Sequence, residues 1–132
     1  MTNSVLEGGE TVWHNGLGSE MKLTADSLGN LTGTYDTAVG RSNGPQPLCG
    51  KYNPGEECPS LGWVVQWKPA ADTPDPQCKG WSTTVWSGQL LKKSDGTYVI
   101  EATWLLTKQT RLDQSWKDTL IGCGLFTQVT TQ

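Results

Sequence analysis

Hydroxyl side chains lie between two tryptophans in residues 81–89, WSTTVWSGQ. In a β-strand successive side chains point to opposite faces, so Ser82, Thr84 and Trp86 would share one face. Such a face makes a poor core, because a buried hydroxyl without a hydrogen-bond partner costs free energy. It suits the wall of a ligand pocket, which is mostly apolar with a few placed polar groups. The chemistry that this segment predicts is therefore non-covalent recognition of a small molecule.

The same alternation assigns similar residues to one face of four further predicted strands. They are Trp13, Asn15, Leu17 and Ser19; Tyr35, Thr37 and Val39; Trp63, Val65 and Trp67; and Trp104 and Leu106. None of these side chains is an acidic or basic one, and indoles are mixed with amide, hydroxyl and phenol groups. Hydrogen bonds to turn backbones would explain one or two of the polar residues, but they explain the whole set less well. The pattern predicts an interior lined by indoles and by a few polar groups.

Short runs of alternating apolar and polar residues, separated by turn residues, are predicted to be strands. They lie near residues 10–16, 20–26, 31–39, 48–52, 61–68, 81–92, 97–107 and 119–130. The proline-rich segment 69–80 cannot be a central strand. Eight antiparallel strands in hairpin order predict an all-β, up-and-down barrel, because closure removes sheet edges and leaves room for one small ligand. A two-sheet sandwich is the structural alternative.

The length and the net charge of the chain limit the number of domains and the kinds of partner that are expected. A chain of 132 residues suggests one domain, which we place at residues 10–132 after an N-terminal tail of residues 1–9. The net charge of −3, without a Lys/Arg cluster, argues against a nucleic-acid partner. No apolar run approaches the roughly 18 residues of a membrane-spanning helix. The first residues show no signal peptide, so the chain is expected to be either cytoplasmic or the mature form of a secreted protein.

The residue types in the predicted pocket favour binding over catalysis. The pocket would contain no paired carboxylates, no nucleophile beside a base and no set of metal ligands. The single histidine, His14, points outward between Trp13 and Asn15. We therefore predict a protein that is not an enzyme and that needs no cofactor or metal.

The cysteines are Cys49, Cys58, Cys78 and Cys123, and their spacing is not that of a metal site. Buried free thiols and one or two disulfides are both compatible with this pattern. Cys49 and Cys78 flank the loop-bearing ends of neighbouring predicted strands, so a bridge between them is one candidate pairing.

The last predicted strand has apolar residues on both faces. Leu120 and Phe126 are expected to face the core, and Gly122 and Gly124 have the same parity. The opposite parity holds Ile121, Cys123 and Leu125. An outward apolar row of this kind suggests a subunit interface, where Cys123 could meet its symmetry mate across a two-fold axis.

The segments LTGTYDTAVG, LGWVVQWK, TTVWSGQ, WLLT and WKDTLIG follow one another over about residues 11–129. In this order and at this spacing they resemble the avidin–streptavidin family of biotin-binding proteins. The resemblance implies an eight-stranded barrel that holds biotin inside and sequesters this vitamin. It also implies a homo-oligomer, usually a tetramer of two closely packed dimers, although some members of the family are dimers.

The resemblance implies a role for each polar residue near the head of the ligand. Asn15, Ser19 and Tyr35 match the three donors that surround the ureido carbonyl oxygen of biotin. Thr37 matches the hydroxyl that accepts from one ureido N–H.

The remaining matches concern the ring system and the tail of biotin. Thr84 matches a hydroxyl near the ring sulfur, and Ser82 matches a hydroxyl that reaches the valerate carboxylate. The indoles that enclose the bicyclic ring match Trp67, Trp86 and Trp104. The apolar side chains that fill gaps match Leu17, Val39 and Leu106.

Two further family features belong to the mouth of the barrel. Trp116 matches an indole that, in the tetramer, covers the ligand of a neighbouring subunit. Residues 40–47, beginning with Gly40, match a lid that closes on bound biotin. Arg41 lies where the family uses backbone N–H groups and small polar residues, so it either adds a charge-assisted contact to the carboxylate or is solvated.

One residue departs from the family pattern. Family members have Asp or Asn at the position of Gly124, where the side chain accepts from the second ureido N–H. Glycine has no such acceptor, and the neighbouring Cys123 has the wrong parity to replace it. A water molecule could fill the gap. The departure leaves open whether biotin binding is weakened or whether the pocket takes another small cyclic ligand.

Overall fold

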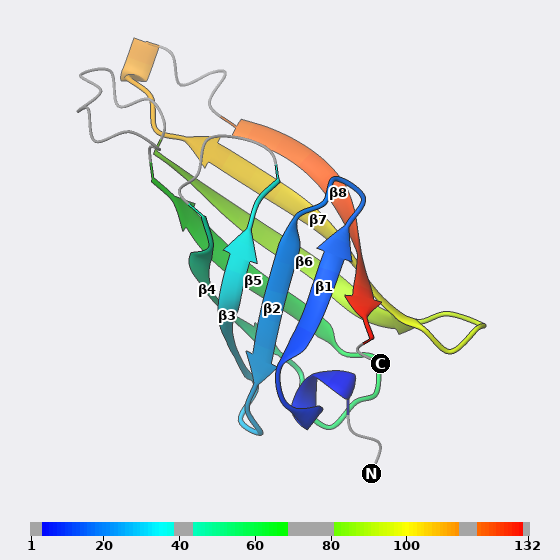
Figure 1. Cartoon of the computed structure of the whole chain (residues 1–132). Helices are drawn as coiled ribbons and strands as arrows, with labels where there is room; N and C mark the ends of the chain where they lie inside the picture. The colour runs from blue at the N-terminus through cyan, green and yellow to red at the C-terminus, as the bar shows by residue number, and fades with distance from the viewer. Residues whose placement is uncertain (1–3, 39–43, 69–80, 114–118, 131–132) are drawn as a thin grey trace.

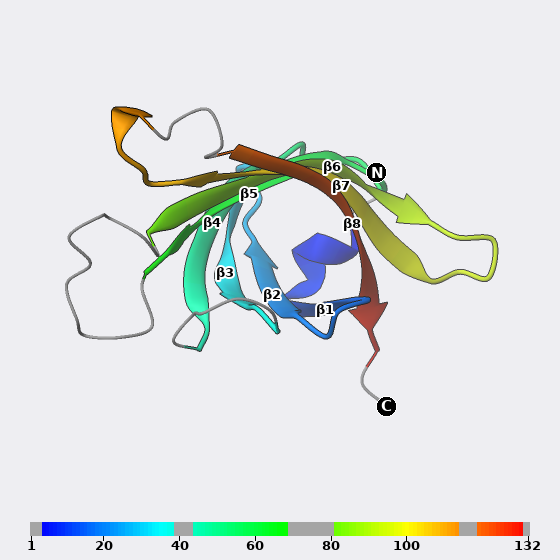
Figure 2. The same ribbon diagram turned by 90° about the horizontal axis from the view of Figure 1, so that it is seen from above.

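The computed structural model describes residues 4–38, 44–68, 81–113 and 119–130. Its elements are the 3₁₀ helix η1 (Val5–Gly8) and the strands β1 (Thr11–Asn15), β2 (Glu20–Ala25), β3 (Asn30–Asp36), β4 (Gln46–Tyr52), β5 (Ser60–Trp67), β6 (Ser82–Lys92), β7 (Tyr98–Lys108) and β8 (Thr119–Val129). Each strand pairs antiparallel with the next and β8 pairs with β1, so the sheet closes into a barrel (Figure 1, Figure 2). The predicted up-and-down barrel is confirmed, and the sandwich alternative is excluded. No helix in these described ranges is long and apolar enough to cross a membrane.

The strands follow the alternation that the sequence shows. In β5 the side chains of Leu61, Trp63 and Val65 are buried, and the residues between them are more exposed. Tryptophan and valine are favoured in strands because they pack well on a pleated, half-buried surface. The inner face of the barrel is therefore built from residues two apart in the chain.

β4 begins at Gln46, two residues earlier than predicted, although it contains Pro47. Pro47 pairs with Thr34 of β3, but the pairing of β4 with β5 begins only at Leu48. Proline lacks an N–H donor and is tolerated in a strand where one neighbour is missing. The proline therefore does not end the strand.

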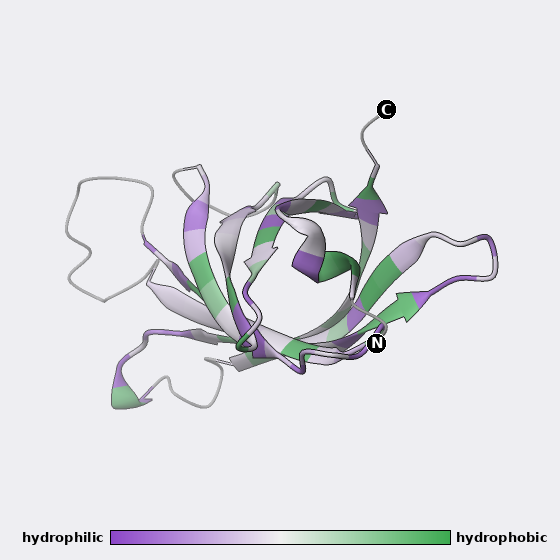
Figure 3. Ribbon diagram, turned by 90° about the horizontal axis from the view of Figure 1, so that it is seen from below, coloured by the Kyte–Doolittle hydropathy of each residue, from purple (hydrophilic) through white to green (hydrophobic). Residues whose placement is uncertain are grey.

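The two ends of the barrel differ. The last residues of β1, β3, β5 and β7 lie at one end of the barrel, which we call the open end, and η1 lies across the opposite, closed end (Figure 3). Leu6 of η1 is fully buried. Ser4 caps η1, because its Oγ accepts from the Leu6 N–H at 3.1 Å and its own N–H donates to Glu7 at 3.1 Å. Part of the segment expected as a tail thus packs against the barrel, and the proposed domain boundary stays a prediction.

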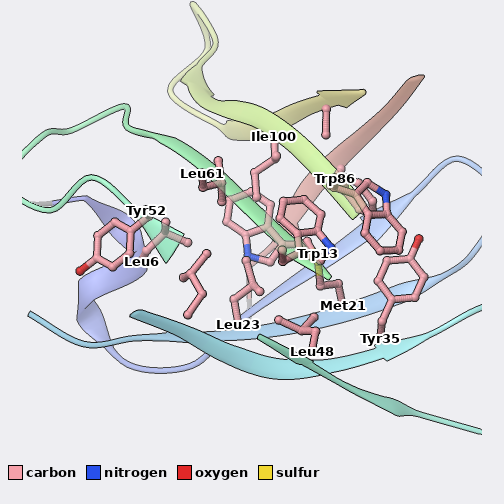
Figure 4. Packing of buried hydrophobic residues seen from close by; sticks show 14 of the residues in the cluster. Leu6, Trp13, Met21, Leu23, Tyr35, Leu48, Tyr52, Leu61, Trp86 and Ile100 are labelled. Atoms are coloured by element: carbon pink, nitrogen blue, oxygen red, sulfur yellow. The ribbon is translucent and has the colours of Figure 1, made fainter. Parts of the chain in front are cut away.

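Buried apolar side chains fill the barrel between the closed end and the open end. Figure 4 shows Leu6 and Tyr52 beside η1, with Trp86 and Tyr35 at the other end of the cluster. The fully buried side chains in this cluster include Trp13, Met21, Leu23, Leu90 and Ile100. Because side chains occupy the closed half, a ligand inside the barrel must lie near the open end.

Two predictions about single side chains are corrected by the structure. Leu120 is 47% exposed rather than in the core, because it lies at the start of β8 where the barrel opens. Cys49 is exposed in the middle of β4, between Thr32 of β3 and Val64 of β5. Cys78 lies outside the described residues, so the candidate Cys49–Cys78 bridge stays a prediction. Neither Cys49 nor Cys123 is a buried thiol, since both are exposed.

Candidate ligand-binding site

Three polar side chains from neighbouring parts of the sheet meet near the open end. Asn15 ends β1, Ser19 precedes β2, and Tyr35 lies near the end of β3. The Asn15 Oδ1 accepts from the backbone N–H groups of Leu17 at 3.0 Å and Ser19 at 2.9 Å. The Asn15 Nδ2 therefore faces Tyr35 and donates to its hydroxyl oxygen at 3.3 Å. Because its amide oxygen is already occupied, Asn15 offers a ligand only N–H donors.

Ser19 and Tyr35 are also held as donors. Ser19 is buried, and its Oγ accepts from the Ala38 N–H at 3.0 Å, which leaves the hydroxyl hydrogen to donate. Burial raises the pKa of Tyr35 above its ordinary 10.0, while hydrogen bonds from Ser19 and Asn15 act in the opposite direction. Tyr35 therefore stays a neutral hydroxyl at physiological pH. Together with Asn15, these groups can surround one acceptor atom such as a carbonyl oxygen.

Aromatic rings form a wall beside the three donors. The Tyr35 ring stacks on Trp86, with centroids 5.0 Å apart and planes at 29°, and it meets Trp67 edge-on at 5.7 Å. Trp86 stacks in turn on Trp63, with centroids 5.4 Å apart and planes at 14°. Phe126 contacts both Tyr35 and Trp63 edge-on. Rings in such arrangements hold one another in place, so the wall is preformed.

Trp63 and Phe126 support the site but were not selected from the sequence as site residues. Trp63 lies directly opposite Trp86 in the β5–β6 register, and both its indole and Phe126 are buried. The signal that could have found Trp63 is its parity, which it shares with Trp67. The sequence does not show that Trp63 and Trp67, four residues apart on the same strand, have different side chains as neighbours.

The hydroxyls of β6 lie at two depths. Thr84 is buried, and its Oγ1 accepts from the Trp67 Nε1 at 2.8 Å, so its hydroxyl hydrogen can donate to a ligand. Ser82 lies opposite Trp67, at the very start of β6, and is only partly buried. Thr84 therefore lies nearer the core, and Ser82 lies nearer the open end.

The other residues predicted for the site differ in how deeply they are buried. Trp104 and Leu106 are partly buried on β7, and Thr37 is partly buried after β3. Leu17 is 67% exposed in the turn after β1, so it does not line an enclosed wall here. Gly124 lies on the inner parity of β8, opposite Ala102 of β7. The predicted site residues outside the described ranges are Val39, Gly40, Arg41 and Trp116.

A surface pocket of about 250 Å³ adjoins the open end of β5, β6 and β7. It is lined by Gln66, Trp67, Trp81, Ser82, Thr83, Thr107 and Gln109. None of these side chains is charged. Beside Ser82, this pocket therefore offers neutral hydrogen-bonding groups rather than a cation.

The outer surface of β6, β7 and β8 carries an apolar row. Val85 lies opposite Leu105, and Leu105 lies opposite Ile121, so the three side chains cross three adjacent strands. Their exposed fractions are 42%, 43% and 71%. Cys123 and Leu125 are exposed farther along β8. The outward direction predicted for Ile121, Cys123 and Leu125 is confirmed, and their role in an interface stays a prediction.

The fold and the site together define a class of protein. The sheet is a closed, antiparallel, eight-stranded barrel, its closed half is filled, and its open end gathers fixed donors beside stacked indoles. In the described part of the chain, no group of three or more His, Cys, Asp or Glu side chains is placed to hold a metal ion. These features are those of a small barrel that binds one small ligand.

Comparison with known proteins identifies the family. The family model "Avidin family" matches residues 6–129. The chain is 35% identical over 127 residues to avidin of Gallus gallus, an alignment that covers 91% of this chain and 77% of that protein. It is 34% identical over 124 residues to avidin-related protein 4/5 of Gallus gallus, covering 90% of this chain and 76% of that protein. The chain belongs to the avidin family.

Proposed function

We propose that this protein binds biotin non-covalently inside the barrel, one molecule per chain, and thereby sequesters the vitamin. The observation that carries the proposal is the convergence of Asn15, Ser19 and Tyr35, each held so that it can donate. A urea oxygen that accepts several hydrogen bonds gains negative charge, and hydrogen bonds to charged acceptors are stronger than neutral ones. Membership of the avidin family supports the choice of ligand.

The rest of the ligand is assigned to the neighbouring groups. Thr37 would accept from one ureido N–H, Thr84 would donate toward the ring sulfur, and Ser82 would reach the carboxylate. The enclosing indoles would be Trp67, Trp86 and Trp104. Rigid rings bury ligand surface and lose little conformational entropy, so the preformed stack of Trp63, Trp86 and Tyr35 favours tight binding. Val39, Gly40, Arg41 and Trp116 are proposed to complete the site at its mouth, and Leu17 and Leu106 to fill gaps.

A titration with biotin tests the proposal. Calorimetry should give about one biotin per chain, and tryptophan fluorescence should change because the ligand would contact several indoles. Biotin recovered from the complex should be chemically unchanged, since the protein is proposed to bind and not to catalyse. Absence of heat and of any thermal shift at millimolar biotin would contradict the proposal.

We also propose that the chain is a homo-oligomer, most simply a tetramer or a dimer. The row Val85, Leu105 and Ile121 leaves apolar surface in contact with water, and a second copy of the chain would remove it. The proposed role of Trp116 also needs a neighbouring subunit.

A second candidate function is binding of biotin with reduced strength, or of another small cyclic ligand. The observation that favours it is Gly124, which supplies no side-chain acceptor on the β8 side of the site. The biotin titration separates the two candidates by the dissociation constant that it yields.

A further inference from the structure

Two glycines of the same parity on β8 lie in different surroundings. A Cβ atom at Gly122 would lie 2.2 Å from Cζ2 of Trp104, so the indole of Trp104 already occupies that place. A Cβ atom at Gly124 would lie 3.5 Å from Cε2 of Phe126 and 3.9 Å from Cδ1 of Trp104. These are ordinary van der Waals distances. Packing therefore requires glycine at position 122, whereas position 124 leaves room for a carbon atom that the protein does not fill.

This room lies beside the donor cluster. Phe126 is the register partner of Asn15, and Gly124 lies two residues farther along β8 toward the open end, on the same face. Thr37 lies just beyond the end of β3, two residues after Tyr35 and also toward the open end. In the proposed mode of biotin binding, a cyclic urea whose oxygen is bound by Asn15, Ser19 and Tyr35 directs one nitrogen toward Thr37 and the other toward Gly124.

The two nitrogens would meet different chemistry. The Thr37 side offers a hydroxyl group, whereas the nearest side-chain atoms to the Gly124 position are carbons of Phe126 and Trp104. An N–H on the Gly124 side would find no side-chain acceptor at that position. A small alkyl group there would instead contact apolar ring edges, which suits it.

We propose that Gly124 is a specificity-determining residue, and that the site accepts cyclic ureas with a small alkyl group on the nitrogen facing Gly124. The inference rests on the proposed binding of biotin. Methylation of this nitrogen removes a donor without a side-chain partner and places a methyl group in the unfilled room. Methylation of the other nitrogen removes the hydrogen bond to Thr37 and crowds that side chain.

The two mono-N-methyl derivatives of biotin, one for each urea nitrogen, test the proposal with the unmodified protein. Calorimetry against biotin as reference should show that one isomer binds within about tenfold of biotin. The other isomer should bind more weakly by roughly tenfold to a hundredfold, the effect of one lost buried hydrogen bond. Equal weakening of both isomers would overturn the proposal.

Two variants assign the effect to position 124. Gly124→Ala fills the room with a methyl group, so the tolerated isomer should lose at least about tenfold in affinity relative to biotin measured on the same variant. Gly124→Asp adds an acceptor, so biotin should be released more slowly and the tolerated isomer should be rejected. An unchanged preference in folded Gly124→Ala, judged by its melting temperature, would overturn the assignment.

The outcomes separate this inference from the proposed function. Biotin binding without discrimination between the isomers would overturn the inference alone. Failure of biotin and of both isomers to bind would overturn the proposed function together with the inference.

Discussion

At the scale of single residues, Tyr35 combines two roles that one substitution separates. Its hydroxyl accepts from Asn15, and its ring stacks on Trp86. Tyr35→Phe keeps the ring and removes the hydroxyl, which would be one of three donors to the ligand oxygen. We expect biotin affinity to fall roughly tenfold to a hundredfold, the cost of one buried hydrogen bond. Calorimetry measures the affinity, and thermal denaturation should show that the fold is retained.

Tyr98→Phe is the matched control for this prediction. Tyr98 begins β7 at the closed end, and its hydroxyl donates to Glu57 at 3.0 Å, far along the barrel from the site. Its loss should leave biotin affinity unchanged. If Tyr35→Phe and Tyr98→Phe bind biotin equally well, the donor role assigned to Tyr35 is wrong.

At the scale of elements, η1 covers the closed end and inserts Leu6 into the core. Leu6 is fully buried, so Leu6→Ala should lower the free energy of unfolding by about 2–5 kcal/mol, the usual cost of this change in a core. Chemical denaturation measures this loss. Leu28→Ala is the control, because Leu28 is 82% exposed and its truncation should cost little. A loss of similar size in both variants would show that η1 does not contribute as an element of the core.

At the scale of the whole molecule, the apolar row on the outer surface predicts self-association. Ile121→Lys places a charge beside Leu105, which is the middle residue of that row. Burying an unpaired charge in a subunit interface is costly. We expect light scattering to show a smaller native mass than for the unmodified protein. The exposure of Ile121 in the single chain means that the barrel itself should stay folded. Leu28→Lys, a change at the closed end, should keep the original mass, and an unchanged mass for Ile121→Lys would exclude this row as an interface.

Three tyrosine hydroxyls predict how the stability of the whole molecule responds to alkaline pH. Burial is the largest cause that raises the pKa of Tyr35, Tyr52 and Tyr98 above the ordinary 10.0, and the carboxylates of Glu7 and Glu57 add to it for Tyr52 and Tyr98. A raised pKa in the folded state means that the folded protein holds its phenolic protons more tightly than the unfolded chain. This stabilising contribution is complete below about pH 10 and is lost as the pH rises through the folded-state pKa values.

The melting temperature should therefore change little on this account near neutral pH and fall above about pH 10. Phenylalanine at position 35 cannot ionise, so the Tyr35→Phe variant should lose less stability over the same alkaline range. Identical alkaline profiles for the variant and the unmodified protein would show that Tyr35 does not contribute.

The inner face of the barrel and the order of the strands could be predicted from the sequence because side-chain alternation is a local property of an extended chain. The alternation placed Trp63 and Val65 on one face of their strand, and Thr84 and Trp86 on one face of the next strand, and all four are buried inside the barrel. The same reasoning predicted a closed barrel, because eight hairpin-connected strands with one apolar face have few other ways to bury it.

Properties that depend on neighbours distant in the chain could not be predicted in this way. Leu6 is buried because the N-terminal segment folds across the end of the barrel, and Leu120 is exposed because the barrel opens at the start of β8. The orientation of Asn15 was also decided by structure, since the turn after β1 brings two backbone N–H groups to its side-chain oxygen.

Gly122 and Gly124 show most directly which properties follow from the sequence and which depend on the tertiary structure. In the sequence they are the same residue type, two positions apart, with the same parity. The barrel register places the indole of Trp104 over Gly122, whereas Gly124 has only ordinary contacts around the place of its missing side chain. The sequence by itself determined which face of β8 these glycines occupy. The tertiary structure alone decided which of them leaves room for a ligand, because that depends on where a ring from another strand comes to rest.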